Sequence, residues 1–579
     1  MKNFLKVLTL IACAGFVAAQ SKFSPDLPVW SAAPGSSSPV GGSQPITPTS
    51  QIDVIVQYQT PPSKNELKQL GPYGQIKKQF VHVNAVSASL TTGQIQTIAT
   101  DTNVKYITPN RPTKGSLDVT TATVNANLAW SLGYTGTGIG VAVIDSGVYA
   151  HDDLKTADGT GSRVVFSESF VPGLDASDQY GHGTHVAGIV GSNGADSTGP
   201  GFKRTLKGVA PNVNLISFRV LDANGAGSDA GVIAAIDEAI NLRTKYNIRV
   251  INLSLGRPVW ESYTLDPLCQ AVEAAWKAGI VVVAAAGNYG RDNSVGEHGY
   301  GTIVAPGNDP YVITVGAMNA MGTSYRGDDI VASYSSKGPT AIDHIVKPDL
   351  VAPGNGVASL MAPNCTLAAT LSNSLVPNSY YKTGGTGTSN TYFRMSGTSM
   401  ATPVVSGAVA LLLQQDPTLT PDQVKAVLMK TAQKGLPKYA MTFDRITNRS
   451  FNLQSDVFAV GAGYLDIGAA LYNHDRTTMP ALSAVATYNS LTHHVSISRG
   501  LTTTWGSSVV WGDGLVYGLD MFSGLDAGGF SVVWGDSVIW GMDDGGGGFS
   551  VVWGDSVLLP MDMQALDVGD DDFSVVWGD

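Results

Sequence analysis

The chain has 579 residues, of which 43% are hydrophobic and 14% charged, and its formal net charge is −11 at pH 7. This length and apolar fraction are ample for a large buried core with appendages. The negative charge gives no reason to expect a nucleic-acid partner, and no apolar run is long enough to predict a transmembrane segment.

The N-terminus has the pattern of a secretory signal peptide. A charged start is followed by the short apolar run Val7–Ala19 and a small-residue end, so residues 1–19 are expected to be removed by cleavage near Ala19. The protein is therefore expected to be secreted, as an extracellular protein that is free or retained at the cell surface. Residues 20–50 are rich in Pro, Ser and Gly and are predicted to be a flexible linker.

Residues 51–115 change in character and predict a small α+β domain. Residues 52–56 and 81–88 alternate between apolar and polar side chains, which is typical of strands. Residues 91–100 suggest a short helix. From the residues alone, an unrelated small domain is the alternative.

The first chemically informative residue of the long segment 118–475 is Asp145. It ends the apolar run Val141–Ile144, which has no alternation and so predicts a strand buried on both faces, as in a parallel sheet. A carboxylate at the carboxyl end of such a strand lies where open α/β sheets place their sites. Taken alone, Asp145 is also explained as a turn residue.

His182 stands at the mouth of a small-residue stretch of helical character, residues 181–191, with a glycine on each side that permits close backbone approach. The simpler explanation is a structural histidine. A metal site with His185 is disfavoured, because the stretch lacks the glutamate of the zinc-protease helix motif and has no nearby cysteine pair.

Ser399 opens the apolar run Val404–Leu413, which predicts a buried helix. At a helix start a hydroxyl is exposed beside unsatisfied backbone N–H groups, which suits the nucleophile of an acyl-transfer enzyme. Taken alone, an ordinary N-cap serine is the commoner explanation.

Together these segments are far more specific, because Asp145, His182 and Ser399 follow the chain order Asp, His, Ser that is found in subtilisin. The segments Asp145–Gly147, His182–Gly188 and Gly397–Pro403 carry a resemblance to the subtilisin-like serine proteases, and the similarity runs from about Val124 to about Leu471. The resemblance implies a three-layer α/β fold with a mostly parallel central sheet.

The resemblance also implies the roles of individual residues in a serine endopeptidase. Ser399 would attack the peptide carbonyl, His182 would take and return the proton, and Asp145 would hold the imidazole. Asn288, at the end of the apolar run Val281–Gly287, would donate to the oxyanion together with the backbone N–H of Ser399. An extended peptide substrate would be held as an added β-strand. The implied substrate-binding residues are Ser254, Leu255, Gly256, Gly225, Gly227, Ala286 and Gly287.

Three further expectations follow from the resemblance. Residues 51–115 would be a propeptide that assists folding and inhibits the enzyme, with self-processing between Thr113 and Thr123. The P1 pocket, which receives the side chain of the residue that contributes the scissile carbonyl, would have Thr302–Val304 at its floor and prefer apolar side chains. No cofactor would be required for the chemistry. Structural Ca²⁺ would involve Asp153, although Ser192–Lys207 departs from the family's usual ligand run.

The tail, residues 476–579, is acidic, rich in tryptophan and repetitive. The heptapeptide Phe530–Asp536 recurs at residues 549–555 and 573–579, and residues 501–579 hold 13 aspartates and no Lys, Arg or Glu. We expect either a low-complexity appendage or a segment that binds a surface or self-associates. A secreted adhesion protein on a protease fold is the alternative function class, although no catalytic residue is missing. Pairing of Cys269 with Cys365 is open.

Overall fold

The computed structural model describes residues 22, 51–70, 76–80, 84–109, 117–292, 298–444, 449–489, 494–498, 515–517 and 529–531. The chain divides into two compact units, residues 1–113 and 114–579, and each is described by itself. No helix within the described ranges is long and apolar enough to cross a membrane. The predicted signal peptide and most of the tail repeats lie outside the described residues.

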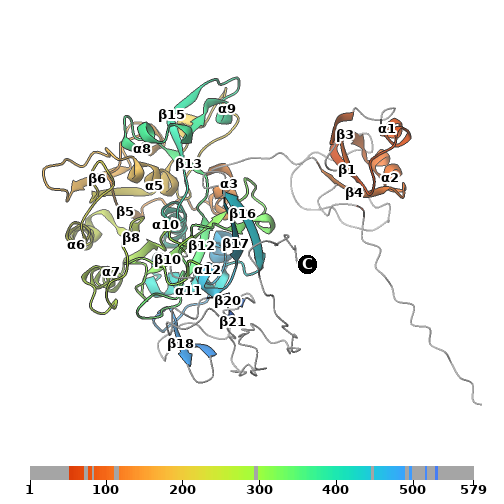
Figure 1. Cartoon of the computed structure of the whole chain (residues 1–579). Coiled ribbons are helices and arrows are strands. Elements are labelled where there is room, and N and C mark those ends of the chain that lie inside the picture. Colours follow the sequence, from red (N-terminus) through yellow and green to blue (C-terminus); the bar gives the residue numbers. More distant parts are fainter. Residues whose placement is uncertain are drawn as a thin grey trace, which may run out of the picture. The chain divides into compact units, whose positions relative to one another are not determined.

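The first unit is a four-stranded antiparallel sheet with two helices (Figure 1). Its strand order is β2 (Ile76–Phe80), β3 (Ala85–Thr91), β1 (Gln51–Tyr58), β4 (Val104–Pro109), and its helices are α1 (Lys64–Leu70) and α2 (Thr92–Ala99). Val54, Val56 and Tyr58 alternate along β1 and are buried in the core of this unit. The predicted α+β character is confirmed. Of the predicted strand 81–88, Ala85–Ala88 belong to β3 and residues 81–83 lie outside the described part.

The second unit is built on an eight-stranded, mostly parallel sheet, as predicted. Only β11 runs antiparallel to its neighbour β10. The apolar strands at the centre of the sheet are buried along their whole length, which explains their lack of alternation. In sheet order the strands are β11 (Ile330–Val331), β10 (Ile313–Asn319), β9 (Val281–Ala285), β8 (Ile248–Leu253), β5 (Gly140–Asp145), β7 (Asn214–Arg219) and β6 (Val164–Ser169), and β12 (Leu350–Pro353) also pairs with β10.

Two groups of helices pack on this sheet and complete the three layers (Figure 1). In one group, α5 (His182–Gly191) packs against α10 (Thr398–Gln415), and both contact β5. In the other, α6 (Asp229–Tyr246) packs against α7 (Pro267–Lys277). Because α10 is apolar on all sides, residues Met400–Leu413 are buried throughout.

The remaining elements are short. Cys269 in α7 and Cys365 before α8 are both buried free thiols, so the structure does not pair them. The helices are α3 (Leu117–Thr123), α4 (Ala126–Ser131), α8 (Thr366–Thr370), α9 (Asn378–Tyr381), α11 (Pro421–Thr431), α12 (Val457–Val460) and α13 (Ile467–Leu471), with 3-10 turns η1 (Asp152–Leu154), η2 (Ala195–Ser197), η3 (Arg326–Asp328) and η4 (Ser372–Ser374). The strands are β13 (Val357–Leu360), β14 (Leu375–Pro377), β15 (Thr388–Met395), β16 (Tyr439–Asp444), β17 (Arg449–Gln454), β18 (Val485–Asn489), β19 (His494–Ser498), β20 (Leu515–Tyr517) and β21 (Gly529–Ser531).

Candidate active site

Asp145 and His182 form a hydrogen-bonded pair where β5 ends and α5 begins. The Nδ1 atom of His182 lies 2.8 Å from Oδ1 and 2.9 Å from Oδ2 of Asp145. The Asp145 carboxylate is fully buried, whereas 12% of the His182 side chain is exposed. Since a carboxylate can only accept, Nδ1 carries the hydrogen and Nε2 is left as the basic nitrogen.

Glycines permit this close approach of α5 to the end of β5. A Cβ atom added to Gly183 would lie 2.1 Å from the carbonyl oxygen of Gly147, so only glycine fits there. Gly147 itself has φ of +106°, in the left-handed region that disfavours other residues. The predicted role of the glycine beside His182 is therefore confirmed for Gly183.

The surroundings of His182 raise its pKa. Burial of the imidazole acts against protonation, but the charge of Asp145 and the hydrogen bond to it act the other way, and the charge of Asp178 adds to them. The balance places the pKa of His182 above its ordinary value. The pair therefore favours the imidazolium ion that forms when the histidine accepts a proton.

Asp178, which sequence reasoning did not single out, fixes the loop that carries His182. Its Oδ1 atom accepts hydrogen bonds from Ser146 Oγ at 2.8 Å and Gly181 N at 2.7 Å. Its Oδ2 atom accepts from Thr184 N at 2.9 Å and Thr184 Oγ1 at 2.5 Å. Ser146 Oγ in turn accepts from Gly183 N at 2.9 Å, so this buried carboxylate ties the histidine loop to the end of β5.

Ser399 lies in the first turn of α10, and the N-cap position belongs to Gly397, so Ser399 is not an N-cap residue. Its half-buried side chain donates from Oγ to the carbonyl oxygen of Ser254 at 3.0 Å, and its own carbonyl accepts from Ser254 Oγ at 2.8 Å. The packing of α10 against α5 brings together the two helices that carry Ser399 and His182.

The side chain of Asn288 is exposed just beyond β9 and is oriented by Thr398. Its Oδ1 atom accepts from Thr398 N at 2.9 Å and from Thr398 Oγ1 at 3.2 Å. Thr398 Oγ1 also accepts from Gly287 N at 3.1 Å. With Oδ1 occupied in this way, the amide presents Nδ2 as its donor, and a Cβ added to Gly397 would lie 3.4 Å from that atom.

The other predicted substrate-binding residues lie beyond strand ends or in one loop. Ser254, Leu255 and Gly256 follow β8, and Ala286 and Gly287 follow β9. Gly225 and Gly227 lie in a tight loop that is closed by a bridge between Leu221 and Gly227.

Val304 lies between two of the predicted substrate-binding residues, Gly256 and Gly287. A Cβ added to Gly256 would lie 2.4 Å from Cγ2 of Val304, and one added to Gly287 would lie 2.8 Å from Cγ1. The two methyl groups of this valine therefore lie against both of these residues.

Comparison with known proteins agrees with this geometry. Residues 136–463 match the model of the Subtilase family. The chain belongs to the subtilase family. The serine protease AprX of Bacillus subtilis is 37% identical over 381 residues, which are 64% of this chain and 78% of that protein. Subtilisin E of Bacillus subtilis is 34% identical over 365 residues, or 62% and 78% of the two chains. This subtilase is a serine endopeptidase.

Two residues of this subtilase that were not singled out from the sequence, Asp178 and Thr398, position functional residues. Asp178 holds Gly181 and Thr184, which lie on either side of His182, and Thr398 holds Asn288. Each is a short polar residue close to a catalytic candidate in the sequence, which is a weak signal, because loops are generally rich in such residues. Their partners on other segments were not visible before the fold was known.

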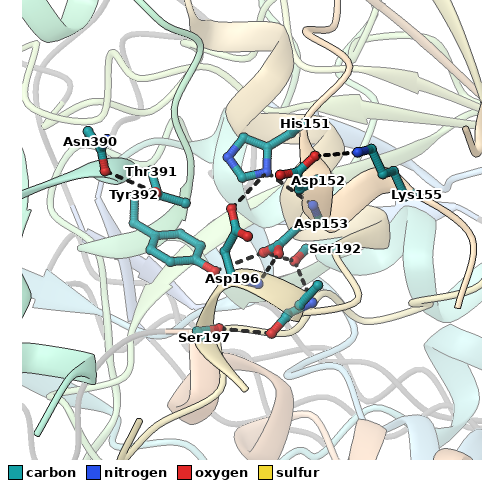
Figure 2. A network of polar contacts seen from close by, with 12 residues as sticks. His151, Asp152, Asp153, Lys155, Ser192, Asp196, Ser197, Asn390, Thr391 and Tyr392 are labelled. Atoms are coloured by element: carbon teal, nitrogen blue, oxygen red, sulfur yellow. Dashed lines mark hydrogen bonds and ion pairs between the residues drawn. The ribbon is translucent and has the colours of Figure 1, made fainter. Parts of the chain in front are cut away.

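The calcium expected at Asp153 does not match the residues around it (Figure 2). A ring nitrogen of His151 and carboxylate oxygens of Asp153 and Asp196 lie within 4.8 Å of one another. However, Asp153 already accepts from Tyr392 Oη at 2.8 Å, Ser192 Oγ at 3.0 Å and Asp196 N at 2.6 Å, and His151 Nδ1 accepts from Asp153 N at 3.1 Å. Calcium takes six to eight oxygen ligands, so a nitrogen and two carboxylates, one of them already hydrogen-bonded three times, do not fit it.

Proposed function

We propose that this subtilase cleaves peptide bonds with Ser399 as nucleophile, His182 as general base and Asp145 as the group that orients His182. The observation that carries this assignment is the 2.8 Å contact between His182 Nδ1 and the buried Asp145 carboxylate, on the helix that packs against the one bearing Ser399. Ser399 attacks the carbonyl carbon, and its proton passes to Nε2 of His182 and then to the leaving amine. A water molecule then attacks the acyl-enzyme in the same way, with His182 as the base, and releases the acyl group from Ser399.

The oxyanion of the tetrahedral intermediate would be held by Asn288 Nδ2 and the backbone N–H of Ser399. Both donors are preorganised, the first by Thr398 and the second by the start of α10. The substrate lies extended between Gly225–Gly227 and Ser254–Gly256, and its P1 side chain enters the pocket above Val304. No cofactor takes part in any of these steps.

Labelling with a fluorophosphonate, which reacts only with an activated serine, tests this proposal. Wild type, His182→Ala and His474→Ala are all labelled after an added protease has removed residues 51–115, because His182→Ala would not process itself, and the adduct is located by mass spectrometry. We expect an adduct on Ser399 that is lost in His182→Ala and kept in His474→Ala. A folded, processed enzyme without an adduct would contradict the triad and favour the adhesion function.

We further propose that the enzyme is exported by residues 1–19 and made as a zymogen whose residues 51–115 inhibit it until they are cut. The compact α+β unit that these residues form, separate from the catalytic unit, supports a propeptide. Ser399→Ala should then accumulate as an unprocessed chain, whereas the wild type yields a new N-terminus between Thr113 and Thr123. Identical processing of both would contradict self-cleavage.

For the tail, we propose attachment to a surface or to a second tail through its repeated β-prone segments. Its 13 aspartates between residues 501 and 579 would keep the segments soluble until they meet a partner. A chain ending at residue 500 should keep its peptidase activity and lose surface retention and self-association. Equal retention and equal mass by light scattering for both chains would contradict this role.

A further inference from the structure

Tyr180, two residues before His182, lies between the catalytic histidine and the loop Leu221–Gly227, which forms one wall of the proposed substrate cleft and is called the wall loop. The centroids of the Tyr180 and His182 rings are 6.4 Å apart and their planes are tilted by 33°. On its other side, a Cβ added to Gly225 would lie 2.6 Å from two atoms of the Tyr180 ring. The ring therefore rests directly against the backbone of Gly225, and it occupies the space between that wall and His182.

The course of the substrate decides which of its side chains meets this ring, a step that rests on the proposed function. Side chains of an extended peptide point alternately to opposite faces. If the P1 side chain enters the pocket lined by Gly256, Gly287 and Val304, the side chain of the preceding residue, P2, points the opposite way. The pocket residues follow β8 and β9, whereas Asp145, the partner of His182, ends β5 and Gly225 follows β7, on the other side of β8 in the sheet. With the scissile carbonyl at Ser399, the direction away from the pocket therefore leads toward His182 and Tyr180.

A three-residue brace, Cys365–Leu367, holds Tyr180 in place. Thr366 N donates to the Gln179 carbonyl at 3.0 Å, and Leu367 N donates to the Tyr180 carbonyl at 3.1 Å. Thr366 Oγ1 also donates to the carbonyl of Ala223, in the wall loop, at 2.8 Å.

The brace also packs tightly beside the histidine. Cys365 lies against Gly181, where an added Cβ would be 2.5 Å from Sγ. The brace thus joins the segment before His182 to the loop that carries Gly225 and fixes the backbone of Tyr180. The Tyr180 side chain packs against the apolar cluster that contains Cys365 and Leu367, so moving the ring would break that packing.

We propose that Tyr180 determines the specificity of this peptidase by restricting P2 to small side chains. The aromatic ring closes the P2 site from the side of Gly225, and the brace keeps it closed. A bulky P2 side chain has to displace the ring or shift the peptide away from Ser399. Since a single misplaced methylene changes specificity by roughly 10- to 200-fold, a whole branched side chain should cost at least about tenfold in kcat/KM.

The test uses peptides that differ only at P2, with Gly, Ala, Leu or Phe, and compares kcat/KM for each. The wild type should prefer Gly and Ala over Leu and Phe by about tenfold or more. Tyr180→Ala should remove most of this preference, and Tyr180→Phe should keep it, because the ring and not the hydroxyl fills the site. Thr366→Val, which removes one hydrogen bond of the brace, should relax the preference in part. Tyr472→Ala, at an exposed position after α13, is the matched control.

Two results would overturn the proposal. One is a wild-type enzyme that accepts Phe at P2 as well as Ala, a result that requires no variant to fold. The other is an unchanged P2 profile in Tyr180→Ala. Fluorophosphonate labelling of Ser399 in the same samples separates this failure from failure of the triad assignment, because a labelled enzyme with the wrong P2 profile refutes only the role of Tyr180.

Discussion

Asp178→Asn is the sharpest test of how the catalytic histidine is positioned. Each oxygen of Asp178 accepts one backbone N–H, from Gly181 or Thr184, and one hydroxyl, from Ser146 or Thr184. Asparagine replaces one oxygen by an NH₂ group. Whichever way the amide turns, that group faces one hydroxyl, which can rotate to accept, and one backbone N–H, which cannot.

The expected loss in the free energy of unfolding follows from that one backbone N–H, which is left without an acceptor. An unsatisfied buried donor costs about 1–3 kcal/mol. Since burial raises the pKa of Asp178, the neutral amide avoids part of the cost of burying a charge. We therefore expect Asp178→Asn to lower the free energy of unfolding by about 2 kcal/mol. Asp178→Ala, which leaves both N–H groups without an acceptor, should lower it by about 4 kcal/mol.

Two assays check this expectation. Urea unfolding in a Ser399→Ala background avoids self-digestion, with Asp237→Asn on the exposed side of α6 as the control for loss of one carboxylate. In the active enzyme, the charge of Asp178 raises the pKa of His182, so its removal should shift the acid limb of kcat/KM to lower pH. A variant within about 0.5 kcal/mol of the control and with an unmoved acid limb would refute the reasoning.

Three further outcomes are expected. Asn288→Ala should lower kcat by roughly 10²–10³ with KM nearly unchanged, the range known for this donor in subtilisin itself; unchanged turnover would remove Asn288 from the oxyanion site. Val304→Gly should deepen the pocket between Gly256 and Gly287 and raise kcat/KM for Phe over Ala at P1 by about tenfold or more; an unaltered P1 profile would place the pocket elsewhere. Burial lowers the pKa of Lys434 to about 7, so between about pH 7 and 10 this lysine is protonated in the unfolded chain and neutral in the folded one. The free energy of unfolding of the wild type should therefore rise with pH over this range, with a slope up to about 1.4 kcal/mol per pH unit steeper than that of Lys434→Met. Equal slopes for the two proteins in urea titrations would contradict this.

The sequence could predict elements whose pattern is set by burial alone. Val141–Ile144 and Val281–Ala285 are apolar without alternation because helices cover both faces of the sheet, and both are strands in the structure. The helix after Ser399 was predictable for the same reason, although its first turn begins at Thr398, before the apolar run. Capping and first-turn residues are chosen by local hydrogen bonds that hydropathy does not report.

Contacts between distant segments could not be predicted. The brace at Thr366 is 143 residues from Ala223 and 187 from Gln179, and no pattern in either segment indicates the other. The free state of Cys365 has the same origin, because its neighbour is Gly181 and not Cys269. Similarly, no pattern near Asp153 indicates that the hydroxyl of Tyr392, 239 residues away, donates to its carboxylate.

The two halves of the site, His182 and Asn288, are positioned by separate sets of hydrogen bonds, called clamps. We therefore expect changes in one half to be independent of changes in the other. Asp178 fixes the histidine loop, whereas Thr398 fixes Asn288, and the hydrogen bonds given for the two clamps share no residue. Thr398→Val keeps the shape of the side chain but removes the hydroxyl between Gly287 N and Asn288 Oδ1. We expect it to lower kcat by about tenfold, the equivalent of one hydrogen bond.

Because sites without shared partners combine additively, the double variant Asp178→Asn/Thr398→Val should lower kcat by the product of the factors measured for the two single variants. It should also lower the free energy of unfolding by their sum, to within about 0.5 kcal/mol. A double variant no slower than the worse single one would mean that the base and the oxyanion donor are positioned as one unit through the packing of α5 against α10. Additive losses would instead show that the proton-transfer and charge-stabilising parts of the site are built, and can be altered, separately.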